Sequence, residues 1–484
     1  MLNKLLFTVF SIFMFLGCYE TGNEQRSSYS LDLDEIKERG TLYAITSYSP
    51  LSYFIYRGQP MGYEYELLKL LAKELEVDLE LVVARDIDHM IDMLNEGEGD
   101  LIAYSLTILN ERAERVSFTT ALNTTRQVLV QRKPEGWRSM KLHEIEQSLT
   151  RNPIELKGET IFVRKGSSYV PRLHNLAQEI GDVIHVIEAS GEQTTDDLIR
   201  LVAEDSLRYT VSDENIAKVN QSYYPDIDVN TAISLPQQTA WAVRKNSPGL
   251  LEEVNQWINE IQMQSDFYAI YNKYFENSRA YRNRADSDFL SFQGGRISEY
   301  DDLIVKYAKN TTLDWKLIAA LIYQESQFNP SARSWAGATG LMQLMPRTAR
   351  AYGANNPSNP DENIQAGSKF LEWLEGYWHD KIQDEDERMK FVLASYNVGQ
   401  GHVQDARRLT NKYNGNPDVW DEVAEFLLKK SDKEYYNDEV VHYGYCRGEE
   451  PVNYVGDIMY IYSHYKRAAM IYEMFNYEPE LAVN

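Results

Sequence analysis

Cysteine, positive charge and clustered histidine are all scarce in this sequence. Its 484 residues include 2 cysteines, so disulfides cannot replace a buried core. The formal net charge is −24, which argues against a general nucleic-acid binder because no dominant basic field exists to meet phosphates. The 8 histidines, His379, His402 and His442 among them, lack metal-ligand spacing, and we expect neither a metal nor a cofactor. A chain of this length is expected to form two or three domains.

The apolar run at residues 5–16 is too short to span a bilayer, and it follows Lys4 as in a signal peptide. It ends at Phe15-Leu16-Gly17-Cys18, which resembles a bacterial lipobox and implies cleavage before Cys18 and lipid on its sulfur. Cys446 would then be the only thiol. We therefore predict a signal peptide at residues 1–17, a tether at 18–34, and a lipid-anchored protein on the periplasmic face of the outer membrane. A plain secretory signal with an incidental cysteine is the alternative, and it also exports the protein.

Residues 35–276 alternate short apolar runs with amphipathic stretches. The pattern predicts strands at 42–46 and 79–83 and helices at 65–75 and 87–95. Strands that alternate with helices indicate an α/β fold with a largely parallel sheet covered on both faces.

Several short motifs in this part occur in the order of a known family. They are Gly62-Tyr63-Glu64-Tyr65-Glu66-Leu67, Gly99-Asp100-Leu101-Ile102-Ala103, Ser105-Leu106-Thr107-Ile108-Leu109-Asn110-Glu111-Arg112, and Gly166-Ser167-Ser168-Tyr169. Together they resemble periplasmic solute-binding proteins of the amino-acid-binding type. The resemblance implies two α/β lobes that close on a small ligand, for which an amino acid or a cell-wall muropeptide fits the polarity.

The same resemblance implies roles in the cleft. Arg112 would hold a carboxylate in a bidentate way, which suits a planar guanidinium. Thr107, Ser167 and Ser168 would add donors, and Asp213 would face an ammonium group. The alternatives are that Arg112 is merely solvated in a charged segment and that the cleft is vestigial.

Residues 277–297 break the periodicity and form the expected linker. From residue 298 to 484 helical periodicity dominates, which predicts an all-α domain. The expected helices are residues 299–309, 315–327, 346–352, 364–378, 388–396, 419–428 and 457–474.

Glu325 stands out in the second of these helices. Asp314 is a suitable N-cap, Asn329-Pro330 is a stop signal, and the apolar spacing places Glu325 on the buried face. A carboxyl there loses hydration, so its pKa should rise and it can act as a general acid. A glutamate that reaches from the helix end to solvent, or pairs with an arginine, is the alternative.

The motifs that follow Glu325-Ser326 form an ordered set. They are Gly337-Ala338-Thr339-Gly340-Leu341-Met342-Gln343, Ala394-Ser395-Tyr396-Asn397-Val398-Gly399, and Glu450-Pro451-Val452-Asn453-Tyr454-Val455. The set resembles the soluble-lytic-transglycosylase domain, a relative of goose-type lysozyme. The family usually has a Glu-Thr pair in the last motif, and Glu449-Glu450-Pro451 replaces it here, which leaves the role of Glu450 open.

This resemblance implies a lysozyme-like fold and a peptidoglycan substrate. Glu325 would be the catalytic residue, and the residues that contact the glycan would be Ser326, Gly340, Met342, Gln343, Tyr396, Asn397 and Tyr454. Met342 could instead fill the core.

The motifs hold no evident second acid, although most glycosidases need two carboxylates. Glu362 and Glu372 look like surface helix charges. We therefore predict a lytic transglycosylase in which Glu325 is both acid and base, and in which the MurNAc 6-hydroxyl closes a 1,6-anhydro ring. A hydrolytic muramidase, a glycan-binding receptor or scaffold without catalysis, and a nutrient-binding lipoprotein are the alternatives.

Overall fold

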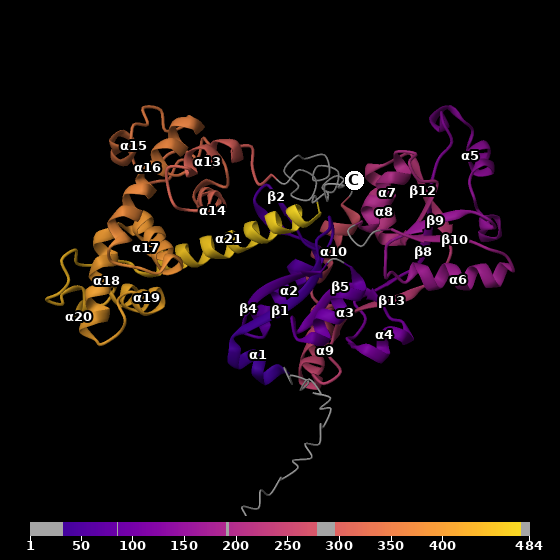
Figure 1. Cartoon of the computed structure of the whole chain (residues 1–484), viewed down its shortest axis with the longest axis horizontal. Coiled ribbons are helices and arrows are strands. Elements are labelled where there is room, and N and C mark those ends of the chain that lie inside the picture. Colours follow the sequence, from indigo (N-terminus) through magenta and orange to yellow (C-terminus); the bar gives the residue numbers. More distant parts are fainter. Residues whose placement is uncertain (1–31, 85, 190–192, 278–295, 476–484) are drawn as a thin grey trace, which may run out of the picture.

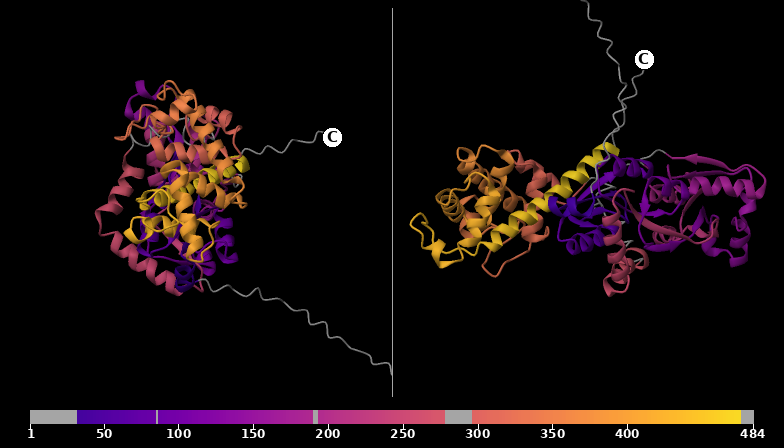
Figure 2. Two further views of the ribbon diagram at one scale, coloured as in Figure 1. Left: turned by 90° about the vertical axis from the view of Figure 1, so that its left-hand side faces the viewer. Right: turned by 90° about the horizontal axis from the view of Figure 1, so that it is seen from below.

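The computed structural model describes residues 32–84, 86–189, 193–277 and 296–475. They form three bodies in a row, which are the helical domain, a first α/β lobe in the middle, and a second α/β lobe (Figure 1). The view from below in Figure 2 shows the same order. Cys18, the predicted signal peptide, and most of the predicted tether and linker lie outside the described residues.

The first lobe surrounds a mixed sheet of order β4-β1-β5-β13-β6, with β7 also paired to β13. β4, β1 and β5 are parallel, whereas β13 runs antiparallel to β5. Its elements are α1 (Leu33–Arg39), β1 (Thr41–Ser47), β2 (Phe54–Tyr56), β3 (Gln59–Met61), α2 (Tyr63–Glu74), β4 (Asp78–Ala84), α3 (Ile87–Glu96), β5 (Leu101–Thr107), α4 (Asn110–Arg115), β6 (Ser117–Phe118), β7 (Asn123–Thr125), β13 (Gln237–Val243), α9 (Pro248–Ile261), α10 (Ser265–Tyr271) and a π-helical turn at Asn272–Glu276.

The second lobe is inserted between β7 and β13, so two chain crossings join it to the first. Its sheet has the order β10-β9-β11-β8-β12, in which β8 is antiparallel to both of its neighbours. Its elements are β8 (Gln127–Arg132), α5 (Leu142–Ser148), β9 (Thr160–Val163), α6 (Tyr169–Ile180), β10 (His185–Glu188), α7 (Thr195–Ala203), β11 (Tyr209–Asp213), α8 (Glu214–Tyr223) and β12 (Ile227–Ala232), with 3₁₀ turns at Trp137–Ser139 and Pro153–Leu156.

The third body is helical within the described residues. Its helices are α13 (Asp301–Ala308), α14 (Trp315–Ser326), α15 (Pro346–Ala351), α16 (Pro360–His379), α17 (Glu385–Val398), α18 (Gln400–Lys412), α19 (Trp420–Lys429), α20 (Lys433–Tyr436) and α21 (Glu449–Phe475). A buried cluster between them includes Ile318, Leu371 and Phe391.

Most of the predicted elements are confirmed, with ends that shift by a few residues. The prediction of a largely parallel sheet is only partly right, because β8, which enters the second lobe, and β13, which returns from it, pair antiparallel with their neighbours. The pattern missed α18 and α20. In α18 the buried apolar residues are few, Val403, Ala406 and Leu409, and they lie among polar and charged residues, so the apolar content of this segment is low. It also placed the start of α21 eight residues late, at 457 instead of Glu449.

The helical domain packs directly on the first lobe through α21, which spans both bodies in Figure 1. The Tyr65 and Tyr460 hydroxyls lie 2.7 Å apart, and the Tyr53 hydroxyl lies 2.6 Å from Nδ1 of His464. Arg467 also pairs with Glu80 at 2.7 Å. One continuous cluster of buried side chains includes residues of both bodies. The two domains are therefore docked rather than loosely tethered.

Candidate active site and ligand cleft

Glu325 lies in the last turn of α14, on a helix whose start and end are both fixed locally. The Asp314 side chain caps the N-terminus by accepting from the Lys316 N–H at 3.0 Å. Gln327 ends the helix in the left-handed region, at φ 51°. Ile318 and Ile322 are buried on the same helix, which anchors the turn that presents the carboxyl.

The carboxyl of Glu325 meets a phenol from the other end of the sequence. The Tyr454 hydroxyl donates to its Oε1 at 2.6 Å, so α21 and α14 meet at the acid. Burial raises the pKa of Glu325 to about 7, and the Tyr454 hydrogen bond offsets part of this rise. The pKa of Tyr454 lies well above its ordinary value, chiefly through burial, so the phenol keeps its proton and remains a donor. A carboxyl with a pKa near 7 can give and take a proton at neutral pH.

The glycine-containing segment after α14 is held closely against the acid-bearing helix. The Ser326 hydroxyl donates to the Leu341 carbonyl at 2.7 Å, and Asn363 on α16 accepts from the Met342 N–H at 2.7 Å. Gly340 has φ 87°, and a Cβ there would collide with the Pro357 carbonyl. Only glycine combines this backbone conformation with such a close approach.

The structure brings some of the predicted substrate residues to the site and places others in support. Met342 has no exposed surface, so of its two interpretations the structure favours the core one. Its carbonyl accepts from the Tyr396 hydroxyl at 2.7 Å, next to the Leu341 carbonyl that accepts from Ser326. Burial, and to a smaller extent the negative charge of Glu325, raise the pKa of Tyr396 well above its ordinary value. The Gln343 amide donates to the Ala332 and Gly340 carbonyls, at 3.0 and 2.8 Å.

Asn397 is exposed at the C-terminal end of α17. Its side chain has both a donor and an acceptor, and the contact with the glycan that the sequence predicts for it stays a prediction.

The other motif acids do not share the environment of Glu325. Glu362 accepts from the Asn355 and Asn356 N–H groups, both at 2.8 Å, and so stabilises a turn before α16. Glu372 and Glu450 are exposed. Glu325 is thus the motif acid that is both desolvated and bonded to a phenol.

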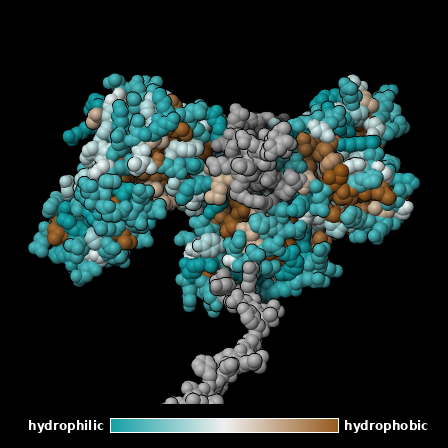
Figure 3. Space-filling model, in the orientation of Figure 1, coloured by the Kyte–Doolittle hydropathy of each residue, from teal (hydrophilic) through white to brown (hydrophobic). Residues whose placement is uncertain are grey.

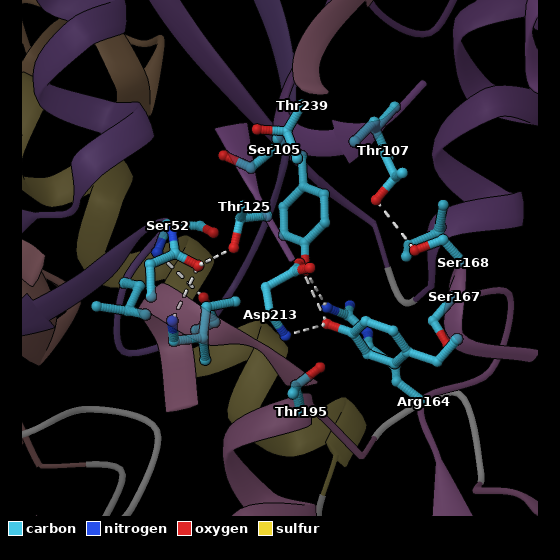
Figure 4. Close-up of a pocket in the computed structure, with 18 of the residues that line it drawn as sticks. Ser52, Ser105, Thr107, Thr125, Arg164, Ser167, Ser168, Thr195, Asp213 and Thr239 are labelled. Carbon is cyan, nitrogen blue, oxygen red and sulfur yellow. Dashed lines mark hydrogen bonds between the residues drawn. The ribbon is translucent and has the colours of Figure 1, made fainter. Parts of the chain in front are cut away.

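A second candidate site is the cavity of about 50 Å³ between the two α/β lobes (Figure 4). The Thr107 hydroxyl of the first lobe lies 3.0 Å from the Ser168 hydroxyl of the second, so the lobes are closed on each other. The Ser167 hydroxyl is buried without a hydrogen-bond partner. Thr107, Ser167 and Ser168 all line this cavity, in agreement with their predicted placement.

Arg112 and Asp213 line the same cavity, and they differ in whether their polar atoms have hydrogen-bond partners. Arg112 donates from Nη1 to the Thr107 carbonyl and from Nη2 to the Gly166 carbonyl, at 3.0 and 2.9 Å, so it joins the two lobes. Asp213 accepts from the Tyr169 hydroxyl at 3.2 Å through Oδ2, whereas its buried Oδ1 has no partner. Burial raises the pKa of Asp213 to about 6. An ammonium donor placed at Oδ1 would favour the charged carboxylate.

Three further charged residues of the cavity escaped the sequence-based prediction. Arg164 crosses between the lobes and donates to the Tyr104 hydroxyl at 2.8 Å and to the Ser47 hydroxyl at 3.1 Å. Burial raises the pKa of Glu64 to about 7 and that of Asp196 to about 6. Glu64 lies inside one of the recognised motifs, and Arg164 directly follows a strand. These positions were the signals that could have placed them in the cleft.

Within the parts of the chain that the structure describes, no three His, Cys, Asp or Glu side chains gather as metal ligands would. Among the helices of the same residues, none is both long enough and apolar enough to cross a membrane.

Comparison with known proteins accounts for both halves of the chain. Residues 41–277 match the bacterial extracellular solute-binding proteins of family 3, and residues 302–419 match the transglycosylase SLT domain. The chain is 36% identical to the membrane-bound lytic murein transglycosylase F of Desulfosudis oleivorans, over 90% of this chain and 91% of that one. It is 31% identical to the protein of the same name from Pseudomonas fluorescens, over 93% and 88%.

A solved structure of the P235GK mutant of the T. maritima protein ArgBP is also similar. It has a TM-score of 0.43 and 25% identity, over 51% of this chain and 99% of that one.

The fold and the matched families define a peptidoglycan lytic transglycosylase, a lyase, with an N-terminal solute-binding module. The chain belongs to the membrane-bound lytic murein transglycosylase F family, which makes it a protein of the cell envelope.

Proposed function

We propose that this enzyme cleaves the β-1,4 bond between MurNAc and GlcNAc without adding water and leaves 1,6-anhydroMurNAc ends. The observation that carries this proposal is the Glu325 carboxyl, which has a pKa of about 7 and accepts a hydrogen bond from Tyr454. At neutral pH such a group is protonated in about half of the molecules, so both of its forms are available.

Glu325 would act twice in the reaction. As an acid it gives its proton to the glycosidic oxygen, and the bond to the MurNAc C1 breaks. The substrate's own N-acetyl group stabilises the positive charge at C1, which removes the need for a second carboxylate. As a carboxylate Glu325 then takes the proton of the MurNAc 6-hydroxyl, whose oxygen bonds to C1. The proton returns to Glu325, so the catalyst is restored and no water is consumed.

Tyr454 supports both steps. Its bond stabilises the Glu325 carboxylate that forms after the first proton transfer, because a hydrogen bond to a charged acceptor is stronger than one to a neutral acceptor. The raised pKa of Tyr454 keeps this donor protonated throughout.

The test is Glu325→Gln, which keeps the shape of the side chain but removes the acid. We expect loss of peptidoglycan digestion by the full chain, with Glu372→Gln as the matched control because Glu372 is exposed on α16. Mass spectrometry of the wild-type products should show ends that lack one water relative to hydrolytic ends. Digestion by Glu325→Gln at the wild-type rate would refute the assignment. It would favour a glycan-binding receptor or scaffold, with the measured digestion caused by a contaminating enzyme.

A hydrolytic muramidase is the second candidate, since one carboxyl could also activate water. Its products would carry the additional water, and the same mass measurement separates the two reactions.

We propose further that Cys18 carries a lipid that anchors the enzyme to the periplasmic face of the outer membrane. The Phe15-Leu16-Gly17-Cys18 motif supports this localisation. Cys18→Ala should move the protein from the membrane fraction to the periplasmic fraction, and an unchanged membrane fraction would argue against the anchor.

For the cleft between the lobes we propose an amino acid or a wall peptide as the ligand. The unpartnered Asp213 Oδ1 suits its ammonium group, and the unpartnered Ser167 hydroxyl suits its carboxylate. Arg112 would add its remaining N–H groups.

Calorimetry against amino acids and muropeptides tests this proposal. Asp213→Asn is the variant of choice, because Arg112→Ala would also remove a contact between the lobes. Equal affinity of Asp213→Asn and wild type would refute the ammonium role.

A further inference from the structure

Arg164 is a buried cation of the ligand cleft, and the proposed function gives it no role. The outer surface of the protein is largely hydrophilic in Figure 3, as expected when most charged side chains lie in water. Arg164, in contrast, has 3% of its surface exposed and lines the cavity between the lobes (Figure 4). Its Nη1 and Nη2 donate to the Tyr104 and Ser47 hydroxyls of the first lobe. Its Nε is buried without a hydrogen-bond partner among the described residues.

The charge of Arg164 has no partner of opposite sign. In the described parts of the chain no carboxylate forms an ion pair with it, and both of its hydrogen bonds go to neutral hydroxyls. Arg244 of the first lobe is buried to the same extent, yet it pairs with Asp100 at 3.3 Å. A buried charge is destabilising unless an opposite charge compensates it. An anion in the cleft would give Arg164 the compensation that Arg244 already has.

Two further acids of the cavity, Glu64 and Asp196, have other partners. Glu64 accepts from the Ser105 hydroxyl at 3.0 Å, and Asp196 accepts from the Asn220 amide at 2.8 Å. Burial raises the pKa of Glu64 to about 7 and that of Asp196 to about 6. A guanidinium in direct contact would hold the pKa of a carboxyl below its ordinary range. Neither acid therefore serves as the ion-pair partner of Arg164.

Arg164 and Arg112 occupy different positions in the cavity. Arg112 donates to the Thr107 carbonyl at the end of β5, whereas Arg164 donates to the hydroxyl of Tyr104 on the same strand. The two anchoring residues are three apart, or about 10 Å along the strand at about 3.3 Å per residue. The cavity thus offers two guanidinium groups, each with its own set of contacts.

We propose that the ligand of this cleft is an amino acid with a second carboxylate, and that Arg164 binds this side-chain carboxylate. The inference rests on the proposed function of the cleft, which already assigns the ammonium group to Asp213 and the α-carboxylate to Ser167 and Arg112. A planar guanidinium with an unused N–H suits a carboxylate oxygen, and a hydrogen bond between two charged groups is stronger than one between neutral groups. The small cavity, of about 50 Å³, favours a single amino acid over a peptide.

Calorimetry on the full chain compares glutamate with glutamine, which differ in the charge at the end of the side chain. Arginine serves as the probe with a cationic side chain, and glutarate as a dicarboxylate without an ammonium group. Both enantiomers of glutamate are measured, because free amino acids are mainly of the L form whereas the cell wall also contains the D form. Both enantiomers carry the second carboxylate, so tight binding of either supports the proposal.

The variants are Arg164→Met, which removes the charge, and Arg164→Lys, which keeps it. Arg138→Met is the matched control, because Arg138 is exposed on the same lobe, pairs with Asp226 at 3.0 Å and does not line the cavity. A thermal melt checks that each variant is folded. The ratio of the glutamate and glutamine affinities is taken within each variant, so a lost contact between the lobes affects both values and cancels.

We expect the wild-type chain to bind glutamate at least tenfold more tightly than glutamine, which corresponds to about 1.4 kcal/mol. In Arg164→Met the two affinities should lie within about threefold of each other, because the group that distinguishes the two ligands is gone. Arg164→Lys should keep part of the preference, and Arg138→Met should match wild type.

Three results would overturn the proposal. Tighter binding of glutamine or arginine than of glutamate by wild type would mean that the cavity acids select the side chain. A preference for glutamate that survives in Arg164→Met would assign the second carboxylate to another group. No binding of any of these ligands would identify Arg164 as a strut that holds the lobes together. Failure of the proposed ammonium site would be seen separately, as glutarate that binds as tightly as glutamate.

Discussion

Replacing Tyr454 by phenylalanine should move the pH profile of the enzyme upward. The substitution removes one hydroxyl, which donates to Glu325 Oε1 at 2.6 Å. This bond favours the charged form of Glu325 and so lowers its pKa, which burial has raised to about 7. Without the bond the protonated acid is favoured, and the pKa must rise further.

The size of the shift follows from the strength of the lost bond. A hydrogen bond to a charged group contributes about 1.5–3 kcal/mol, and one pKa unit corresponds to about 1.36 kcal/mol. Complete loss would thus raise the pKa by about 1–2 units. Glu325 keeps part of its surface exposed, and water can replace some of the lost bond, so we expect about one unit.

The assay is the pH dependence of kcat/KM on purified peptidoglycan. In the proposed mechanism the first step needs protonated Glu325, so activity should fall as the pH rises through its pKa. In wild type this decline should centre near pH 7, and in Tyr454→Phe about one unit higher, on a lower maximum. Tyr462→Phe is the matched control, because Tyr462 lies on the same helix and its hydroxyl donates to Asp314 instead of Glu325. An unchanged or downward-shifted decline in Tyr454→Phe would refute the reasoning.

Three further predictions concern the framework of the protein. Gly340→Ala should destabilise the helical domain by about 1–3 kcal/mol, because its φ is 87° and a Cβ has no space, whereas Gly376→Ala, in open space on α16, should raise the melting temperature slightly. Lys430→Met should cost about 1.5–3 kcal/mol in denaturant unfolding, since it removes one of the two cations that pair with the buried Asp405 carboxylate and leaves Arg408 as the other, and an unchanged stability would contradict this. Tyr65→Phe removes the hydrogen bond between α2 and α21. It should therefore weaken any effect of cleft ligands on glycan cleavage, because α2 also carries Glu64, which lines the cleft. An unchanged response to added amino acid or muropeptide would contradict this coupling.

Local patterns predicted most helices and strands because each depends on residues close in sequence. The N-cap Asp314 and the apolar positions of α14 are examples, and both are as expected. The pattern failed in α18, where the few apolar residues stand among many polar ones, and in the first lobe, where the direction of β13 depends on the path of the chain through the second lobe.

The candidate sites show the same division. The motifs predicted that Thr107, Ser168 and Asp213 would meet in one cleft, and they do. They could not predict that Arg164 would cross between the lobes, because its partners Tyr104 and Ser47 lie far away in the sequence. The sequence also could not decide whether Met342 is buried, since a methionine at that position suits either a core or a cleft.

The sequence by itself determined the two-part organisation and the family, because these depend on ordered motifs and local periodicity, and it predicted Glu325 as the acid. Only the tertiary structure decided how Glu325 is tuned and what surrounds it. Its pKa depends on the water that α14 and its neighbours exclude and on a phenol 129 residues away. Desolvation and contact are properties of the folded chain, so no segment of sequence carries them alone.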